Sequence, residues 1–138
     1  MLIYDKKDEQ IKQQIDVVNE AYAPHNIFFN HVETIRTFNE TWANGSNTTT
    51  MQAELRKGSY ATLNVYSMIS LYGPPLGRCN LPEAVEAGDD AFLEDGCTIV
   101  AGTMPGGDVP DNDQGGTLVH EVRTSNDITS PIRTERFS

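Results

Sequence analysis

The sequence of 138 residues lacks the features that mark several protein classes. No run approaches the roughly 18 consecutive apolar residues of a membrane-spanning helix, which argues against an integral membrane protein. Residues 1–7 contain no basic segment followed by an apolar one, so no signal peptide is visible. The length is that of one domain.

Basic residues are also scarce, with ten Lys and Arg against twenty Asp and Glu and a net charge of −10. The deficit lies mostly in residues 71–138, which hold twelve acidic and four basic side chains. This balance argues against binding nucleic acid or an anionic membrane through a basic face. It favours a solvated acidic surface, and a cation site is the alternative.

Residues 39–50 are mostly polar and predict a surface loop. The segment contains three Asn-x-Ser/Thr sequons, at Asn39, Asn44 and Asn47. Three sequons so close together favour a secreted, glycosylated protein. An Asn- and Thr-rich loop that never meets a glycosyltransferase is the alternative.

Only two cysteines are present, Cys79 and Cys97, and they lie 18 positions apart. An even number of cysteines beside sequons favours a disulfide, as in extracellular proteins. Such a bond would close the acidic loop between the two residues and contribute about 3 kcal/mol of stability. Two buried thiols in a reducing cell are the alternative.

Hydrophobic periodicity predicts a mixture of helices and short strands. Apolar residues recur at helical spacing from Ile11 to Tyr22, which predicts a helix over residues 5–22. Pro24 should end this helix, because the residue before a proline disfavours helical geometry. We expect strands at residues 27–32, 62–69 and 97–102, and residues 34–38 are either a second strand or a continuation of the first. We also expect a short helix after residue 49, a long loop over 72–96 and a helix beginning near 115.

Three aspartates, Asp108, Asp111 and Asp113, lie just before two glycines. The spacing from Asp111 resembles the start of a calcium-binding EF-hand loop. The fifth position of that loop is Gly115, however, and the twelfth is Val122 rather than Glu. A solvated turn is therefore the favoured interpretation.

The pair His120–Glu121 is the main candidate for catalytic chemistry. In a His-Glu-x-x-His helix, two histidines four residues apart share one helix face and bind zinc, and the glutamate is the general base. An apolar strand and a Gly-rich turn precede the pair here, which favours that context. Position 124 is Thr, however, and the glycine and third histidine of the elongated motif are replaced by Asp127 and Ser130.

The remaining histidines, His25 and His31, lie far upstream of this pair. We expect them to be ordinary surface or core residues rather than replacement zinc ligands. The sequence therefore provides one of the three protein ligands that a catalytic zinc usually needs.

Several blocks of the chain resemble the secreted fungal extracellular metalloproteases, which are pappalysin-type metzincins. Residues 14–27 (QIDVVNEAYAPHNI) are similar to the first helix and following strand of that family, and residues 54–66 (ELRKGSYATLNVY) to its second helix and next strand. Residues 95–100 (DGCTIV), 105–107 (PGG) and 116–122 (GTLVHEV) resemble the approach to its zinc helix. The resemblance covers roughly residues 5–122.

The resemblance implies a mixed α/β (α+β) catalytic domain with a twisted mixed sheet, an N-terminal helix and the start of the active-site helix. It places residues 1–122 in the upper part of that domain and leaves residues 123–138 as an unrelated, disordered tail. It also implies that the chain starts at the first helix, without the signal peptide, pro-region and first strand of the family. His120 would be the first zinc ligand and Glu121 the general base.

The function implied is that of a secreted zinc metalloendopeptidase with protein or peptide substrates, and not with nucleic acid or membrane partners. Because the zinc motif stops after His120–Glu121, we expect this chain to be a truncated, inactive form of such an enzyme. A non-catalytic fragment that binds peptides, or acts as a decoy, is the alternative.

Overall fold

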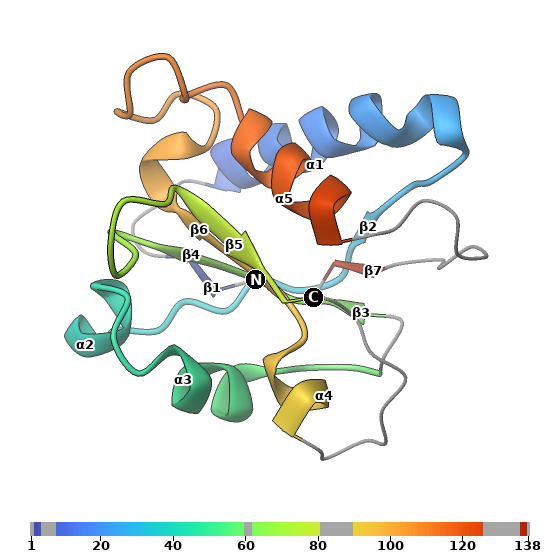
Figure 1. Ribbon diagram of the computed structural model, residues 1–138. Helices are drawn as coiled ribbons and strands as arrows, with labels where there is room; N and C mark the ends of the chain where they lie inside the picture. The colour runs from blue at the N-terminus through green and yellow to red at the C-terminus, as the bar shows by residue number, and fades with distance from the viewer. Residues whose placement is uncertain (1, 4–7, 60–61, 81–89, 126–135, 138) are drawn as a thin grey trace.

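Helices cover both faces of a small mixed sheet (Figure 1). The computed structural model describes residues 2–3, 8–59, 62–80, 90–125 and 136–137. The elements in chain order are β1 (Leu2–Ile3), α1 (Asp8–Tyr22), η1 (Ala23–His25), β2 (Asn30–His31), α2 (Glu40–Ala43), α3 (Thr48–Leu55), β3 (Thr62–Leu63), β4 (Val65–Met68), β5 (Gly77–Cys79), α4 (Asp90–Glu94), β6 (Cys97–Val100), η2 (Ala101–Thr103), α5 (Gly116–Ser125) and β7 (Arg136–Phe137). The predicted α/β class is confirmed.

The main sheet has the strand order β1-β4-β6-β5. The first three strands are parallel, and β5 is antiparallel to β6 at one edge. A second set of strands, β2, β7 and β3, pairs in parallel. In Figure 1, α1 and α5 lie on one side of the main sheet, and α2, α3 and α4 lie on the other.

The central strand β4 supplies side chains to both layers, because successive residues of a strand point to opposite faces. Val65 belongs to the core shared with α1 and α5, whereas Tyr66 and Met68 pack with Met51 of α3. All four residues of β4 are buried. This double burial is typical of a central parallel strand with helices on both faces of its sheet.

Helix α1 buries the stripe that its periodicity predicts. Ile11, Ile15, Val18 and Tyr22 are all in the core, and the Tyr22 ring meets the Phe29 ring edge to face at 5.9 Å between centroids. The helix gives way to η1 at Ala23, beside Pro24, and Asn26 then adopts a left-handed conformation with φ of 56°. The helix therefore ends where the proline predicts.

Several short elements differ from the prediction. Only Asn30–His31 of the expected strand at 27–32 is a strand, and residues 34–38 contain a single bridge residue, Ile35. The polar segment 39–50, predicted to be a loop, contains α2 and the start of α3. Helix α2 begins there because the Asn39 side chain accepts a hydrogen bond from the Trp42 amide. The expected long loop at 72–96 contains β5 and α4.

Both ends of the chain carry elements that the sequence did not predict. The strand β1 precedes α1 and pairs with β4, whereas the resemblance placed the start of the chain at the first helix. The boundary predicted at residue 122 falls inside α5, which continues to Ser125 because no helix-breaking residue intervenes. Residues 136–137 form β7, and residues 126–135 of the predicted disordered tail lie outside the described residues.

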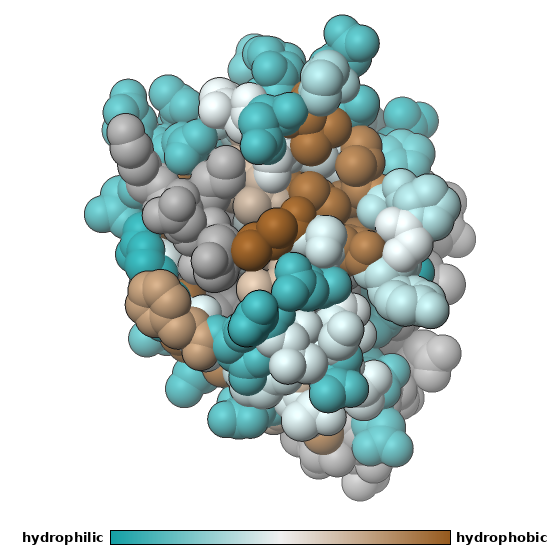
Figure 2. All heavy atoms as spheres, turned by 90° about the vertical axis from the view of Figure 1, so that its left-hand side faces the viewer, coloured by the Kyte–Doolittle hydropathy of each residue, from teal (hydrophilic) through white to brown (hydrophobic). Residues whose placement is uncertain are grey.

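The surface mixes polar and apolar side chains. Of the large apolar residues in the described part of the chain, Phe38 and Tyr72 are the most exposed to solvent, at 94% and 85%. Figure 2 shows the face on the left of Figure 1, where apolar side chains gather near the centre and hydrophilic ones surround them. Among the residues that the structure describes, no helix is both long and apolar enough to span a bilayer.

Candidate active site on helix α5

Helix α5 carries the His120–Glu121 pair and begins directly after a tight turn. Gly115 makes this turn with φ of 81°, a conformation that side chains disfavour, and its amide donates to the Thr103 carbonyl at 3.0 Å. Leu118 and Val122 are completely buried in the core. His120 is exposed, whereas Glu121 is partly buried and its side chain lies beside Gly77 of β5.

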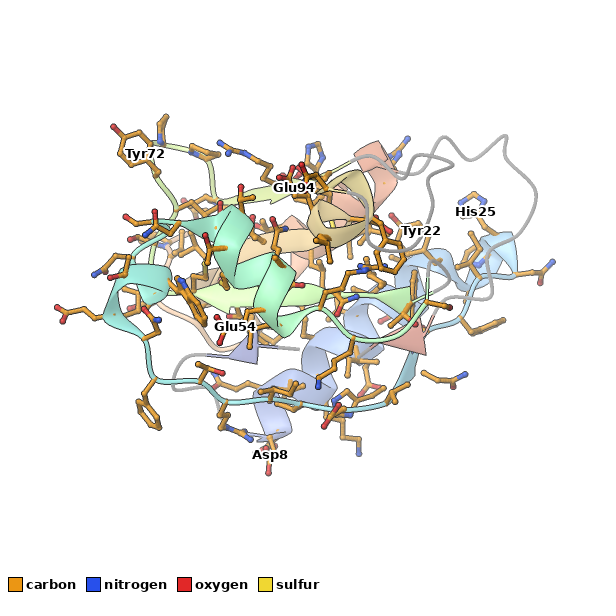
Figure 3. All side chains as sticks on the ribbon, turned by 90° about the horizontal axis from the view of Figure 1, so that it is seen from below. Asp8, Tyr22, His25, Glu54, Tyr72 and Glu94 are labelled. Carbon is orange, nitrogen blue, oxygen red and sulfur yellow. A yellow bond between two sulfur atoms is a disulfide. The ribbon has the colours of Figure 1, made fainter. Side chains whose placement is uncertain are left out.

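The other two histidines are on other elements, His25 on η1 and His31 on β2. His25 is exposed at the outer end of η1, where Figure 3 shows its ring at the periphery of the molecule. His31 is exposed on β2, and its Nε2 lies 2.7 Å from Thr34 Oγ1. Their interpretation as ordinary residues stays a prediction.

The described residues do not fit a complete catalytic zinc site. Among them there is no group of three or more His, Cys, Asp or Glu side chains that could hold a metal ion. His120 offers one imidazole, and a catalytic zinc usually takes three protein ligands. The arrangement can supply a metal ligand and an adjacent carboxylate, but it does not close a metal centre by itself.

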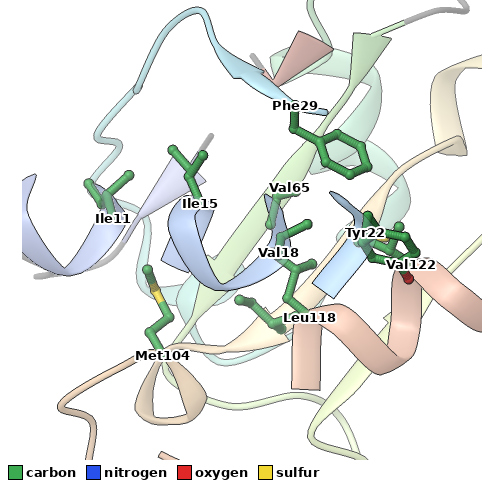
Figure 4. Packing of buried hydrophobic residues seen from close by; sticks show 11 residues of the cluster. Ile11, Ile15, Val18, Tyr22, Phe29, Val65, Met104, Leu118 and Val122 are labelled. Carbon is green, nitrogen blue, oxygen red and sulfur yellow. The ribbon is translucent and has the colours of Figure 1, made fainter. Parts of the chain in front are cut away.

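Helix α1 holds α5 and the loop before it through polar side chains. The Tyr22 hydroxyl donates to the Val119 carbonyl at 2.8 Å, next to His120 in the sequence. The Gln14 Nε2 donates to the Gly115 carbonyl at 3.0 Å, and Gln14 is completely buried. Figure 4 shows the Tyr22 ring beside Val122 within the core. These bonds fix the position of α5 along its own axis and its rotation about that axis.

The edge strand β5 lies beside α5 and is linked covalently to its neighbour. Cys79 and Cys97 are directly opposite each other in the β5–β6 register and form a disulfide with a Cα–Cα distance of 4.0 Å. The pairing continues beyond β5, where the Val100 amide donates to the Leu76 carbonyl at 2.8 Å. The structure thus contains the disulfide that the sequence favoured, and the bond stabilises the edge of the sheet.

The aspartates at 108–113 form a turn. Asp111 has a positive φ of 63°, and the Asp113 carbonyl accepts a hydrogen bond from the Gly106 amide at 3.1 Å. The side chain of Asp108 lies close to Gly102. In the described part of the chain these carboxylates form no metal-binding group.

The three sequons lie on the other side of the sheet from α5 (Figure 1). Asn39 caps α2 through its side-chain oxygen, at 3.1 Å from the Trp42 amide. Asn44 follows α2, and Asn47 precedes α3 with φ of 53°. Both Asn44 and Asn47 are exposed.

A buried charged cluster near α4 was not found from the sequence. Arg56 lies 3.6 Å from the Asp95 carboxylate and donates to the Asp95 carbonyl at 2.6 Å, and its guanidinium stacks over Phe92 at 4.2 Å. Tyr66 is nearby, and burial raises the pKa of its hydroxyl far above the ordinary value. Arg56 reads in the sequence as a surface residue after a helix, and no local signal indicates its distant partner.

Comparison with known proteins supports the resemblance to extracellular metalloproteases. The chain is 44% identical over 115 residues to extracellular metalloprotease 1 of Coccidioides posadasii (strain C735), a match covering 83% of this chain and 41% of the relative. It is 45% identical over 115 residues to an extracellular metalloprotease of Pyricularia oryzae, covering 83% and 40%, and 41% identical to one of Colletotrichum graminicola, covering 83% and 41%.

The chain spans about two-fifths of the length of these curated relatives. No family model matches the sequence, and no solved structure matches it. The similarity supports a relationship to metalloproteases, and the name of these relatives implies a metal cofactor in the relatives themselves.

Proposed function

We propose that this chain corresponds to the upper part of the catalytic domain of a secreted zinc metalloendopeptidase of the pappalysin type of metzincins. The observation that carries the proposal is the position of His120–Glu121 on a helix packed beside an antiparallel edge strand. Similarity over 115 residues to fungal extracellular metalloproteases supports it. Protein or peptide substrates outside the cell follow from the same proposal.

In this proposal His120 is the first zinc ligand and Glu121 the general base. Zinc in such enzymes supplies a Lewis acid that activates water. The partly buried Glu121 carboxylate would accept the proton of the attacking water, and the exposed His120 imidazole would bind the metal. One imidazole is two ligands short of a catalytic centre, so we propose that the 138-residue chain alone hydrolyses peptide bonds negligibly.

A chimera tests both roles. Residues 123–138 would be replaced by the corresponding C-terminal region of the Coccidioides posadasii relative, and cleavage of casein would be measured. We expect activity that His120→Ala abolishes and that Glu121→Gln lowers by about 10²–10⁴-fold in kcat. Glu54→Gln on the exposed surface of α3 is the matched control. Full activity of the Glu121→Gln chimera would contradict the assignment, and zinc-dependent cleavage by the unaltered chain would contradict its inactivity.

A non-catalytic peptide-binding role is the second candidate. The sheet order places β5 at an edge, where an extended peptide could add as a further strand. Calorimetric titration of the chain with denatured casein peptides tests this role. Saturable heats support it, and flat heats remove it.

We also propose that the sequons of this chain are glycosylated when it passes through a secretory pathway. All three lie on the side of the sheet opposite α5, so glycans there would leave His120 and Glu121 accessible. The chain would be secreted from yeast behind a leader peptide and its mass measured before and after removal of N-glycans. Asn39→Asp keeps the capping oxygen but removes the acceptor nitrogen, and Asn44→Asp and Asn47→Asp remove the acceptor nitrogen at sites without a side-chain cap. Each change should remove one glycan, whereas an unaltered mass for the secreted parent chain would contradict the proposal.

A further inference from the structure

The glycine at position 77 lies where β5 meets helix α5. Gly77 is buried and pairs with Ile99 in the β5–β6 register. Its φ is not positive, so the backbone there does not need glycine for a turn. A different reason must explain a residue that weakens strands.

The neighbouring side chains of α5 supply that reason. A methyl group on the Gly77 Cα would lie 2.7 Å from Glu121 Cγ, 3.3 Å from Glu121 Cδ and 3.0 Å from Thr117 Cγ2. Thr117 and Glu121 are four residues apart and therefore share one face of the helix. The stem of Glu121 thus lies directly on the backbone of β5, at a separation that a methyl group at position 77 would make too short unless Glu121 moved.

The other contacts of α5 prevent the helix from moving away to make room. The Tyr22 hydroxyl bond to the Val119 carbonyl and the completely buried side chains of Leu118 and Val122 hold the helix against α1 and the core. The Cys79–Cys97 disulfide holds β5 on β6 two residues from Gly77. A side chain at position 77 would therefore act mainly on the conformation of Glu121.

We propose that Gly77 is a positioning residue for Glu121, because its missing side chain lets the Glu121 carboxyl group lie against the edge strand. The inference rests on the proposed function only for the role of Glu121 as general base. The contact itself concerns two residues of this chain and is measurable without any metal or peptidase activity.

A double-mutant cycle on the 138-residue chain tests the contact. Urea unfolding would be measured for the parent, Gly77→Ala, Glu121→Ala and the double variant. We expect Gly77→Ala to raise the unfolding equilibrium constant about tenfold in the parent, as overpacking does, and by a clearly smaller factor when Glu121 is alanine. Gly116→Ala is the matched control, because nothing lies within 4 Å of a methyl group there. Equal effects of Gly77→Ala in both backgrounds would overturn the proposal.

A spectroscopic measurement separates positioning from general stability. In the parent chain, nuclear Overhauser contacts are expected between the Glu121 γ protons and the Gly77 α protons. Gly77→Ala should shift the Glu121 carboxyl carbon resonance, whereas Gly116→Ala should leave it unchanged. Absence of the contacts in the parent overturns the proposal even if Gly77→Ala fails to fold. An inactive chimera combined with an intact Gly77–Glu121 coupling would overturn the proposed function alone.

Discussion

The two sides of strand β4 are built differently. On the side of α1 and α5, a large apolar cluster is supplemented by hydrogen bonds such as that from Tyr22 to Val119. On the side of α3 and α4, the apolar cluster formed by the described residues is small, with Met51, Tyr66 and Met68 as its buried members, and the Arg56–Asp95 ion pair lies close by.

The two sides of β4 therefore show two ways of holding a helix against a sheet. The α5 side gains most of its stability from burial of apolar area, and its hydrogen bonds add orientation to a helix already held in place. The side of α3 and α4 contains a buried ion pair, and removing one member of such a pair strongly lowers the free energy of unfolding. The candidate site lies on the side where orientation is added to apolar packing, which is the arrangement that a precise chemical site needs.

The largest expected effect is from breaking the ion pair. Arg56→Met keeps most of the aliphatic stem but removes the positive charge that faces Asp95, and the Arg56 side chain is only 2% exposed. We expect a loss of about 4 kcal/mol in the free energy of unfolding, measured by urea titration. Arg36→Met is the control, because its pair with Asp8 is exposed at 44% and 89%, and it should cost about 0.5 kcal/mol or less. Similar losses in the two variants would remove the contrast between the two sides.

Next in size is the disulfide at the edge of the sheet. Replacing Cys79 and Cys97 together by serine should lower the free energy of unfolding by about 3 kcal/mol, because the bond closes a loop of 18 residues in the unfolded chain. Amide exchange should accelerate at Val100, whose amide bonds to Leu76, more than in β4. Uniform acceleration throughout the sheet would show that the bond stabilises the fold in general and not its edge.

Removing a single hydroxyl tests the orientation of α5. Tyr22→Phe deletes the bond to the Val119 carbonyl but keeps the ring packed in the core, and we expect a loss of about 1 kcal/mol. Amide exchange in α5 should accelerate while that in α3 stays unchanged. Tyr72→Phe, at an 85% exposed position, is the control and should change neither quantity. Equal acceleration in α3 and α5 would contradict a local role.

The sequence predicted elements whose signal is local. The apolar stripe from Ile11 to Tyr22 gave α1, and the glycines before Thr117 gave the start of α5. Strand β5 was missed because its three residues, with a glycine and an arginine among them, are a strand only through pairing with Cys97–Val100. The bonds from α1 to α5 join residues about 100 positions apart, and no local pattern encodes them.

The candidate site was predictable to the extent that its residues form a motif. The motif alone picks out His120 and Glu121 as candidates. The roles of His120 as metal ligand and of Glu121 as general base stay predictions. The part played by Gly77 was not predictable, because a glycine in a Gly- and Pro-rich segment indicates a turn unless the strand opposite is known. Tertiary pairing, not composition, decides which glycine lies under Glu121.

The smallest effect at neutral pH is expected from the buried tyrosine on the α3 side. The Tyr66 hydroxyl has no hydrogen-bond partner among the described residues, so Tyr66→Phe should be neutral or stabilise by up to about 1 kcal/mol at pH 7.

At alkaline pH the parent chain should lose stability, because burial raises the folded-state pKa of Tyr66 above its ordinary value of 10.0. Above that pH the unfolded chain loses a proton that the folded chain keeps, and the free energy of unfolding falls by up to about 1.4 kcal/mol per pH unit. Urea titrations at pH 7 and at pH 11 should show a smaller drop in the free energy of unfolding for Tyr66→Phe than for the parent chain. Tyr72→Phe is the control and should resemble the parent. Equal drops in all three chains would show that Tyr66 does not control alkaline stability.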